Sequence, residues 1–382
     1  HVALLAFFKY YEFLILGLES LASAAGLDTG ILRHALPSME ILFPVGLSFY
    51  TFQGLSYAID HYRCPDEPPR AFLDVLLLVS FFPTIMAGPI MRARQFLPQL
   101  GHRTWDSRDL QEGFALILSG LFKKVVIASY LSEHIVRDVF ESPEFYSSWT
   151  ILAAVYAYSI QIFCDFSGYS DMAIGVGRLM GFRLPENFRS PYLALNIQDF
   201  WRRWHISLTS WFRDYLYIPL GGSRRGAIRT YCNILIVFLV SGFWHGAGWT
   251  FLVWGALHGL AQVVERVWGR GRDRLPFVLR WGLTFLFVNI AWVLFRAPDC
   301  TGAVTGGFAK PAAWLLEGLF AEETSAVQML IPAFTPWKNI LRVVLLYGAG
   351  MVAVLWPRNT IRRMEDFRPT LWRGAALTVL TL

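Results

Sequence analysis

Apolar residues follow one another in long, charge-free runs along this chain. Six runs contain no Asp, Glu, Lys or Arg: residues 41–59, 75–91, 145–164, 230–264, 281–295 and 343–356. A helix needs about 20 apolar residues, with a range of about 17 to 25, to cross a bilayer. Several runs reach this length, and the shorter ones require tilt or a partly buried path. The pattern predicts a bundle of membrane helices.

Two further apolar stretches, residues 4–18 and 115–131, are interrupted by Lys or Glu, which brings the expectation to roughly eight to ten membrane helices or re-entrant elements. Composition agrees, because 55% of the residues are hydrophobic and only 16% are charged. We therefore expect residues 1–382 to form a single all-α polytopic membrane domain. Since the chain begins at His1 and ends inside an apolar run, we expect native segments to be missing at both ends.

Polar stretches and glycine pairs predict how the helices are connected. Residues 60–74 and 92–112 are polar and predict two loops. The pairs Gly177/Gly181 and Gly255/Gly259 predict close helix contacts, because small residues let helix backbones approach.

The run 230–264 is 35 residues long, and a straight helix of that length would reach ~52 Å across a hydrocarbon core of ~30 Å. It must therefore bend or break. Three glycines, Gly242, Gly246 and Gly248, weaken the helix near its middle. Non-helical backbone at that depth is tolerated only where it is buried in protein or lines a wet cavity. We expect the neighbouring His245 to mark such a cavity.

Residues 196–215 predict one amphipathic helix, because large apolar residues recur there at helical spacing. They are Trp201, Trp204, Leu208, Trp211, Phe212 and Tyr215. Asn196 is expected to cap this helix, with Asp199 in its first turn. His205 lies one turn from members of the apolar face, so we expect it to face protein or lipid.

The net charge of +6 is concentrated in a few segments. Six arginines lie close together: Arg202, Arg203, Arg213, Arg224, Arg225 and Arg229. Short basic loops between membrane spans stay cytoplasmic, so we expect residues 224–229 and 266–274 on that side. Apolar runs flank each patch, which disfavours nucleic acid as a partner. Binding of an anionic substrate and anchoring at the headgroups of the lipid bilayer both stay open.

An imidazole at membrane depth suits proton transfer. An unpaired charge there costs at least ~2.5 kcal/mol, whereas neutral histidine avoids much of this cost and still accepts a proton from a hydroxyl. The structural alternative is that His245 only bonds a backbone group freed by the glycine break. No Cys, His or carboxylate cluster has the spacing of metal ligands, so we expect no metal.

Seven motif segments together carry a family resemblance: residues 43–50, 82–89, 165–175, 185–192, 200–208, 213–222 and 242–246. Their combination resembles the membrane-bound O-acyltransferase (MBOAT) family. The resemblance is strongest to the bacterial branch of alginate O-acetyltransferases and D-alanyl transfer proteins of lipoteichoic acid synthesis. It implies the MBOAT fold, with membrane helices around a central cavity.

The resemblance also implies a function. By position, His245 matches the family's essential histidine, which promotes attack of an acceptor hydroxyl on an acyl thioester, and His205 matches a second polar position. An O-acetyltransferase of the bacterial inner membrane is implied, with acetyl-CoA as cytoplasmic donor and no tightly bound cofactor. A separate periplasmic acetyltransferase would be its partner and would modify an extracellular polysaccharide such as alginate.

Further residues are candidates for the walls of the site. The donor-binding candidates are Arg202, Arg203, Trp204 and Arg213. The cavity-lining candidates are Asp165, Asp171, Glu186, Asn187 and Trp244. For the two aspartates, helix capping or orientation of a neighbour is the alternative. His258 is expected to serve helix packing.

Two other functional classes stay open. A transporter or flippase without covalent chemistry would use the same buried polar positions to bind a carried group. A scaffold that recruits polysaccharide enzymes would need none of the buried histidines. Cleavage of acetyl-CoA that depends on His245 would separate the enzyme from both.

Overall fold

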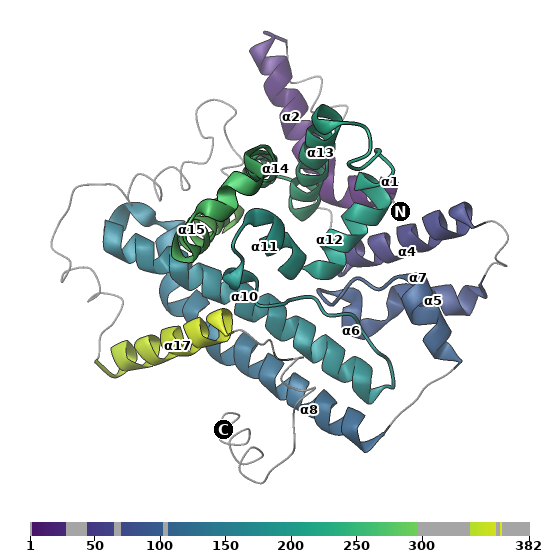
Figure 1. The fold of residues 1–382 in the computed structure, drawn as a ribbon, viewed down its shortest axis with the longest axis horizontal. Coiled ribbons are helices and arrows are strands. Elements are labelled where there is room, and N and C mark those ends of the chain that lie inside the picture. The colour runs from purple at the N-terminus through teal and green to yellow at the C-terminus, as the bar shows by residue number, and fades with distance from the viewer. Residues whose placement is uncertain are drawn as a thin grey trace.

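The computed structural model describes residues 2–27, 44–64, 70–101, 106–296, 337–356 and 360, and every regular element among them is a helix (Figure 1). The prediction of an all-α polytopic membrane protein is confirmed. Four described segments are long and apolar enough to cross a membrane: Ser107–Glu141, Ser148–Leu179, Ala227–His245 and Phe277–Arg296. The larger number of eight to ten membrane elements stays a prediction, as does the single domain over residues 1–382.

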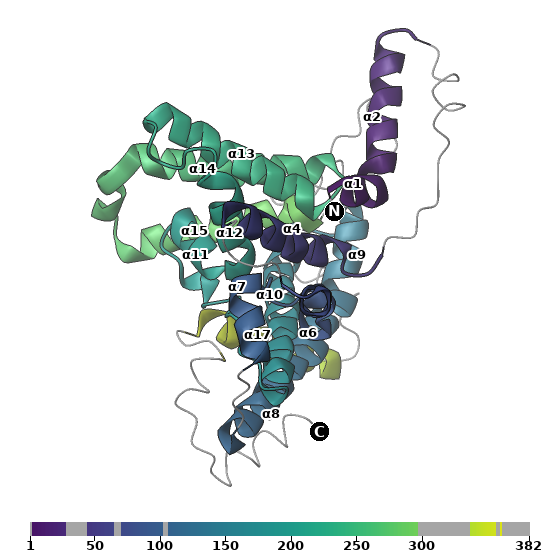
Figure 2. The same cartoon turned by 90° about the vertical axis from the view of Figure 1, so that its right-hand side faces the viewer.

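The N-terminal elements are α1 (Val2–Leu5), the π-helix η1 (Ala6–Tyr10) and α2 (Tyr11–Ala24), which projects from the body in Figure 2. They are followed by α4 (Leu47–Arg63), α5 (Phe72–Ser80), α6 (Phe82–Ile85), α7 (Ala93–Phe96) and the 3-10 helix η2 (Leu97–Leu100). The apolar run 75–91 is thus broken at Phe81, whose ψ is 99°. Pro83 lacks the amide that would continue the preceding turn. The loop predicted at 92–112 is wrong in its described part, since α7 and η2 fill residues 93–100 and a further helix begins at Ser107, while residues 102–105 lie outside the described residues.

Two long segments run side by side across Figure 1. The first is α8 (Ser107–Leu121), continued by η3 (Phe122–Ser129), η4 (Ser132–Val136) and α9 (Arg137–Glu141), and the second, after η5 (Pro143–Phe145), is α10 (Ser148–Leu179). Their backbones meet at glycines. A Cβ added to Gly168 would lie 2.7 Å from the carbonyl oxygen of Gly120, and one added to Gly175 would lie 2.6 Å from that of Gly113. Glycine therefore sets the distance between α8 and α10.

The run 230–264 breaks where its glycines predict. Its two halves are α13 (Ala227–His245) and α14 (Trp249–Trp268), which lie side by side in Figure 2. Between them, Gly246 and Gly248 are extended, each with φ of −159°. The predicted contact at Gly255 is confirmed, because an added Cβ there would lie 3.4 Å from the Cα of Gly242. The predicted pair Gly177/Gly181 is wrong, since Gly181 lies beyond the end of α10 with φ of 79°.

The remaining elements are η6 (Pro191–Leu193), α11 (Ile197–Arg203), α12 (Ile206–Phe212), the π-helix η7 (Arg213–Tyr217), η8 (Gly269–Arg274), α15 (Phe277–Arg296) and α17 (Trp337–Leu355). Short helices α11 and α12 lie in the middle of Figure 1, with longer helices around them. Phe200 of α11 packs 6.4 Å from Trp292 of α15, which in turn stacks 6.2 Å from Trp254 of α14. These aromatic contacts place α11 at the core.

Candidate active site around two histidines

The predicted single helix over 196–215 is wrong, because the chain breaks at His205. α11 ends at Arg203, α12 begins at Ile206, and His205 adopts a left-handed conformation with φ 45° and ψ 55°. Such a backbone costs a non-glycine residue about 1–3 kcal/mol, and it persists only where surrounding structure enforces it. The predicted cap is confirmed, since the side chain of Asn196 accepts the amide of Asp199.

Asn187 holds this break in place. Its carbonyl oxygen accepts the amide of Ile206 at 3.0 Å, and its side-chain oxygen accepts the hydroxyl of Ser207 at 2.9 Å. Its amide group donates to the hydroxyl of Ser170 on α10 at 3.2 Å. Asn187 is completely buried. A cavity-lining candidate from the sequence therefore proves to be the link between α10 and the segment that carries His205.

The His205 ring is buried, with 1% of the residue exposed. It packs edge-on against Phe166, with ring centroids 4.6 Å apart. Neither ring nitrogen has a hydrogen-bond partner among the described residues. Burial and, to a smaller extent, the nearby charge of His245 lower the pKa of His205 well below its ordinary value, so its imidazole is neutral at pH 7. Most buried polar groups in proteins have a hydrogen-bond partner, so a buried ring with two unpaired nitrogens is a candidate functional group.

His245 is the last residue of α13 and is partly buried. Its ring lies among aromatic side chains, with centroid distances of 4.9 Å to Trp244, 5.3 Å to Trp254 and 5.2 Å to Phe295. Within the described part of the chain, the ring makes no hydrogen bond. The structural alternative, in which His245 bonds a backbone group freed by the glycine break, is therefore not observed there.

The third histidine of this region, His258, is fully buried in α14. Its Nδ1 accepts a hydrogen bond from the indole of Trp201 at 3.2 Å, and its ring lies 4.9 Å from that of Trp254. These contacts agree with the expected packing role.

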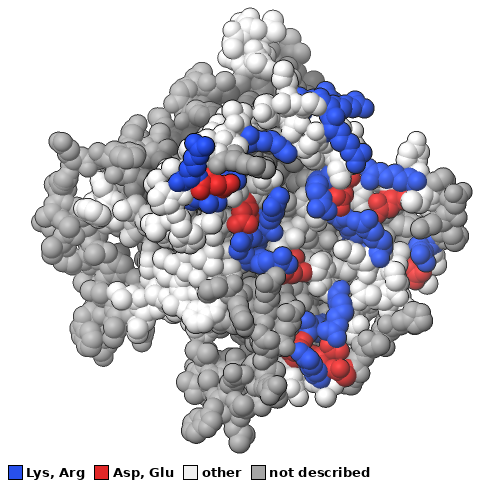
Figure 3. Space-filling view, in the orientation of Figure 1, with Lys and Arg blue, Asp and Glu red and all other residues white. Residues whose placement is uncertain are grey.

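A cavity of about 440 Å³ lies between α11, α12, α13 and α14. Its polar wall includes Gln198, Arg202, Ser210, Arg213, Ser241, Gln262 and Arg266. Ser241 stands one helical turn before His245 on α13, and neither His245 nor His205 is itself part of the cavity wall. Figure 3 shows more basic than acidic side chains over the middle of this face of the molecule. A concave site with three arginines suits an anionic ligand.

Only two of the four donor-binding candidates line this cavity, namely Arg202 and Arg213. Arg203 instead pairs with Asp199 at 2.9 Å, and Trp204 is buried against Phe200, 5.6 Å away in a stacked arrangement. Gln262 and Arg266 also line the cavity but were not predicted as donor-binding residues, although their spacing of four residues places both on one face of α14.

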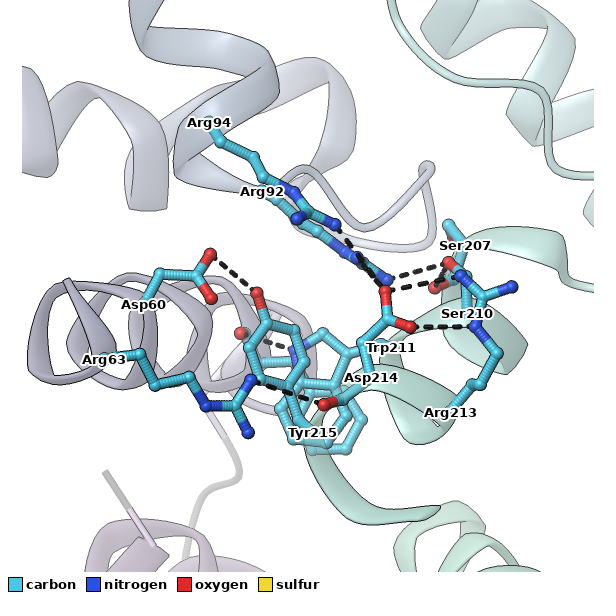
Figure 4. A network of polar contacts seen from close by, with 11 residues as sticks. Asp60, Arg63, Arg92, Arg94, Ser207, Ser210, Trp211, Arg213, Asp214 and Tyr215 are labelled. Atoms are coloured by element: carbon cyan, nitrogen blue, oxygen red, sulfur yellow. Dashed lines mark hydrogen bonds and ion pairs between the residues drawn. The ribbon is translucent and has the colours of Figure 1, made fainter. Parts of the chain in front are cut away.

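An ion-pair network fixes α12 and η7 against the N-terminal half of the fold (Figure 4). Asp214 pairs with Arg92, Arg94 and Arg213. Burial raises the pKa of Asp214, but hydrogen bonds from Arg213 and Arg92 outweigh this and hold the pKa below its ordinary value. Tyr215 adds a hydrogen bond of 2.8 Å to Asp60 on α4.

Three cavity-lining candidates lie outside the cavity wall and make ion pairs. Asp165, with half of its side chain exposed, pairs with Lys124. Asp171 is buried and pairs with Lys123 at 2.6 Å. Glu186 pairs with Arg189 at 2.6 Å. The remaining candidate, Trp244, is also absent from the cavity wall and is buried against Phe52, with the two rings stacked 5.1 Å apart.

Fold and site together define a helical integral membrane protein in which two histidines stand at helix breaks and the helices that carry them also line a basic cavity. Residues 39–301 match the sequence profile of MBOAT, the membrane-bound O-acyltransferase family. The chain belongs to this family.

Three curated relatives illustrate its range. The chain is 40% identical to the probable alginate O-acetylase AlgI of Pseudomonas putida over 334 residues, which cover 86% of this chain and 67% of the relative. It is 39% identical to the peptidoglycan O-acetyltransferase of Helicobacter pylori, covering 80% and 62%. It is 28% identical to the teichoic acid D-alanyltransferase of Bacillus subtilis, covering 68% and 70%. Across the alginate relatives, the matched part is between 56% and 67% of their length.

Proposed function

We propose that this protein is an O-acetyltransferase of the bacterial inner membrane. It takes an acetyl group from cytoplasmic acetyl-CoA and delivers it across the membrane for O-acetylation of an extracellular polysaccharide such as alginate. The observation that carries the proposal is the His245 ring, which makes no hydrogen bond to the described residues and stands at a helix break, one turn after Ser241 of the basic cavity wall. The names of the alginate and peptidoglycan relatives support acetyl as the acyl group.

In the proposed reaction, His245 is the general base. Its neutral imidazole removes the proton of an acceptor hydroxyl while the hydroxyl oxygen attacks the thioester carbonyl. The carbon–sulfur bond then breaks, and the thiolate of CoA takes the proton from the imidazolium. His205, neutral and buried, donates or accepts a hydrogen bond that orients the reacting groups. The aromatic rings around both histidines exclude bulk water from this step.

The arginines of the cavity supply the donor site. Arg202, Arg213 and Arg266 offer charged, forked donors that match phosphate oxygens. We assign them to the phosphates of acetyl-CoA, so that the thioester points along the cavity towards Ser241 and His245. The donor is a substrate in this scheme, and no tightly bound cofactor takes part.

The arginine-rich loops give the proposed direction of transfer. Residues 224–229 and 266–274 flank α13 and α14 and would lie in the cytoplasm by the positive-inside rule. A periplasmic acetyltransferase would then receive the acetyl group on the other side and pass it to the polysaccharide. Labelling of Ser223→Cys in intact cells by a reagent confined to the periplasm would contradict this orientation.

The decisive experiment separates acyl transfer from transport and from scaffolding. Full-length protein in lipid vesicles is given acetyl-CoA with a labelled acetyl group together with a hydroxyl-bearing acceptor on the opposite side of the membrane, and release of free CoA is followed. We expect release by the wild type and none above background by His245→Ala. A carrier or a scaffold would give no CoA release that depends on His245.

A further inference from the structure

The C-terminal end of α13 leaves carbonyl groups without helical partners. An α-helix has four such carbonyls at its end, because no further turn supplies amides to them. The carbonyl of Gly242 accepts the amide of Gly246 at 3.3 Å. Beyond it the chain is extended, so Phe243 and Trp244 need other donors for their carbonyls. Both residues directly precede His245.

Two neighbouring side chains of η1 supply these donors. The hydroxyl of Tyr10 donates to the carbonyl oxygen of Phe243 at 2.7 Å, and the ammonium group of Lys9 donates to the carbonyl oxygen of Trp244. The Tyr10 ring also stacks on Phe243, with centroids 4.0 Å apart. The N-terminal segment therefore caps the helix that carries His245, across more than 230 residues of sequence.

Lys9 is well suited to this position. A cation is stabilised at the C-terminal, negative end of a helix dipole, and its ammonium group also lies 5.5 Å from the centre of the Trp244 ring. Within the described part of the chain Lys9 makes no ion pair, and its hydrogen bond goes to this carbonyl. Lys9 is partly buried, and the carbonyl of Trp244 is the acceptor of its ammonium group.

We propose that Lys9 and Tyr10 are positioning residues for His245. By fixing the last two carbonyls before it, they hold the end of α13, and with it the imidazole, in position. This inference rests on the proposed function, because it takes His245 as the reacting group. Neither residue lines the cavity, so their removal should affect the chemical step and leave donor binding unchanged.

The test compares Lys9→Met, Lys9→Arg and Tyr10→Phe in the full-length protein in lipid vesicles. Donor-binding sites are counted with labelled acetyl-CoA, and kcat for CoA release is expressed per binding site. A displacement of about 1 Å can cost 10²-fold in rate, so Lys9→Met should lower kcat about 10- to 100-fold with KM for acetyl-CoA within about twofold. Lys9→Arg, which keeps a cationic donor, should restore most of the rate. Tyr10→Phe should lose about three- to tenfold, as expected for one neutral hydrogen bond of ~1 kcal/mol.

Lys124→Met is the matched control, because Lys124 also lies in a π-helix but pairs with Asp165 away from the cavity. Its kcat should equal that of the wild type. A wild-type kcat per site in Lys9→Met, with His245→Ala inactive, would overturn the positioning role. If Lys9→Met binds no donor at all, Tyr10→Phe decides by the same criterion. An active His245→Ala would overturn the proposed function and the role of Lys9 with it.

Discussion

The break that carries His205 and the break that follows His245 have different origins. After His245 the chain leaves the helix at Gly246 and Gly248, where glycine weakens helical structure locally. At His205 there is no glycine. The residue is left-handed because Asn187, from another segment, accepts hydrogen bonds from the amide of Ile206 and the hydroxyl of Ser207. The break after His245 is therefore encoded by neighbours in sequence. The break at His205 is imposed by tertiary hydrogen bonds.

This difference predicts different sensitivities to mutation. The α13–α14 break should persist when side chains around it change, so that substitutions at His245 report on chemistry. The α11–α12 break stores backbone strain, so that substitutions there report on stability and on chemistry together.

The largest effect is expected at His245. His245→Gln keeps a hydrogen-bonding side chain but cannot take up a proton at neutral pH, so it should be as inactive as His245→Ala. Loss of a general base typically costs about 10²–10⁴-fold in rate. The rate of CoA release from labelled acetyl-CoA measures this loss. A near wild-type rate in His245→Gln would show that another group is the base, with His205 the first to test.

Asn187→Ala should have the next largest effect. It removes the donor to the Ser170 hydroxyl and the acceptor of the Ser207 hydroxyl, both buried, and each such loss costs about 1–3 kcal/mol. We expect a lower unfolding temperature and a rate about 10²-fold lower, because His205 loses its position. Asn233→Ala is the control, since Asn233 is equally buried but bonds the backbone of Gly222 at 2.9 Å. Equal rate losses in the two variants would contradict a link between Asn187 and the site.

Substitutions at His205 should separate strain from function. Asparagine accepts the left-handed conformation, so His205→Asn should keep the break, whereas His205→Gly relieves the strain but leaves a cavity in place of the buried ring and should lower the unfolding temperature. His205→Asn should retain a transfer rate within about tenfold of the wild type, because its amide can also form the orienting hydrogen bond. A tenfold loss would correspond to ~1.4 kcal/mol. Complete loss of activity in folded His205→Asn would contradict an orienting role.

The smallest effect is expected in the donor site. Arg266→Gln removes one charge from the cavity wall and should raise KM for acetyl-CoA about three- to tenfold, with the difference shrinking at high salt. Arg203→Gln should leave KM unchanged, because Arg203 lies outside the wall and pairs with Asp199. If the two variants behave alike, the cavity is not where the donor binds.

The sequence predicted the features that depend on nearby residues. The Asn196 cap and the α13–α14 break each need only a few neighbouring positions. The cap of Lys9 on Trp244 joins residues 235 positions apart, and the pair of Arg92 with Asp214 joins residues 122 apart. Hydrophobic periodicity within a single segment carries no information about such distant pairs. The left-handed His205 is hidden for the same reason, since the apolar spacing around it fits an unbroken helix.

The glycine contacts between α8 and α10 make the protein intolerant of change at residues that lie outside the cavity wall. Gly120 and Gly168 leave no space for even a methyl group, because an added Cβ on Gly168 would lie 2.7 Å from the opposing carbonyl oxygen. An alanine there would force the two helices apart. Ser170, two residues after Gly168, is the anchor of Asn187. The shape of the His205 segment thus depends on the absence of two methyl groups, and evolutionary variation at these glycines would be limited although neither touches a substrate.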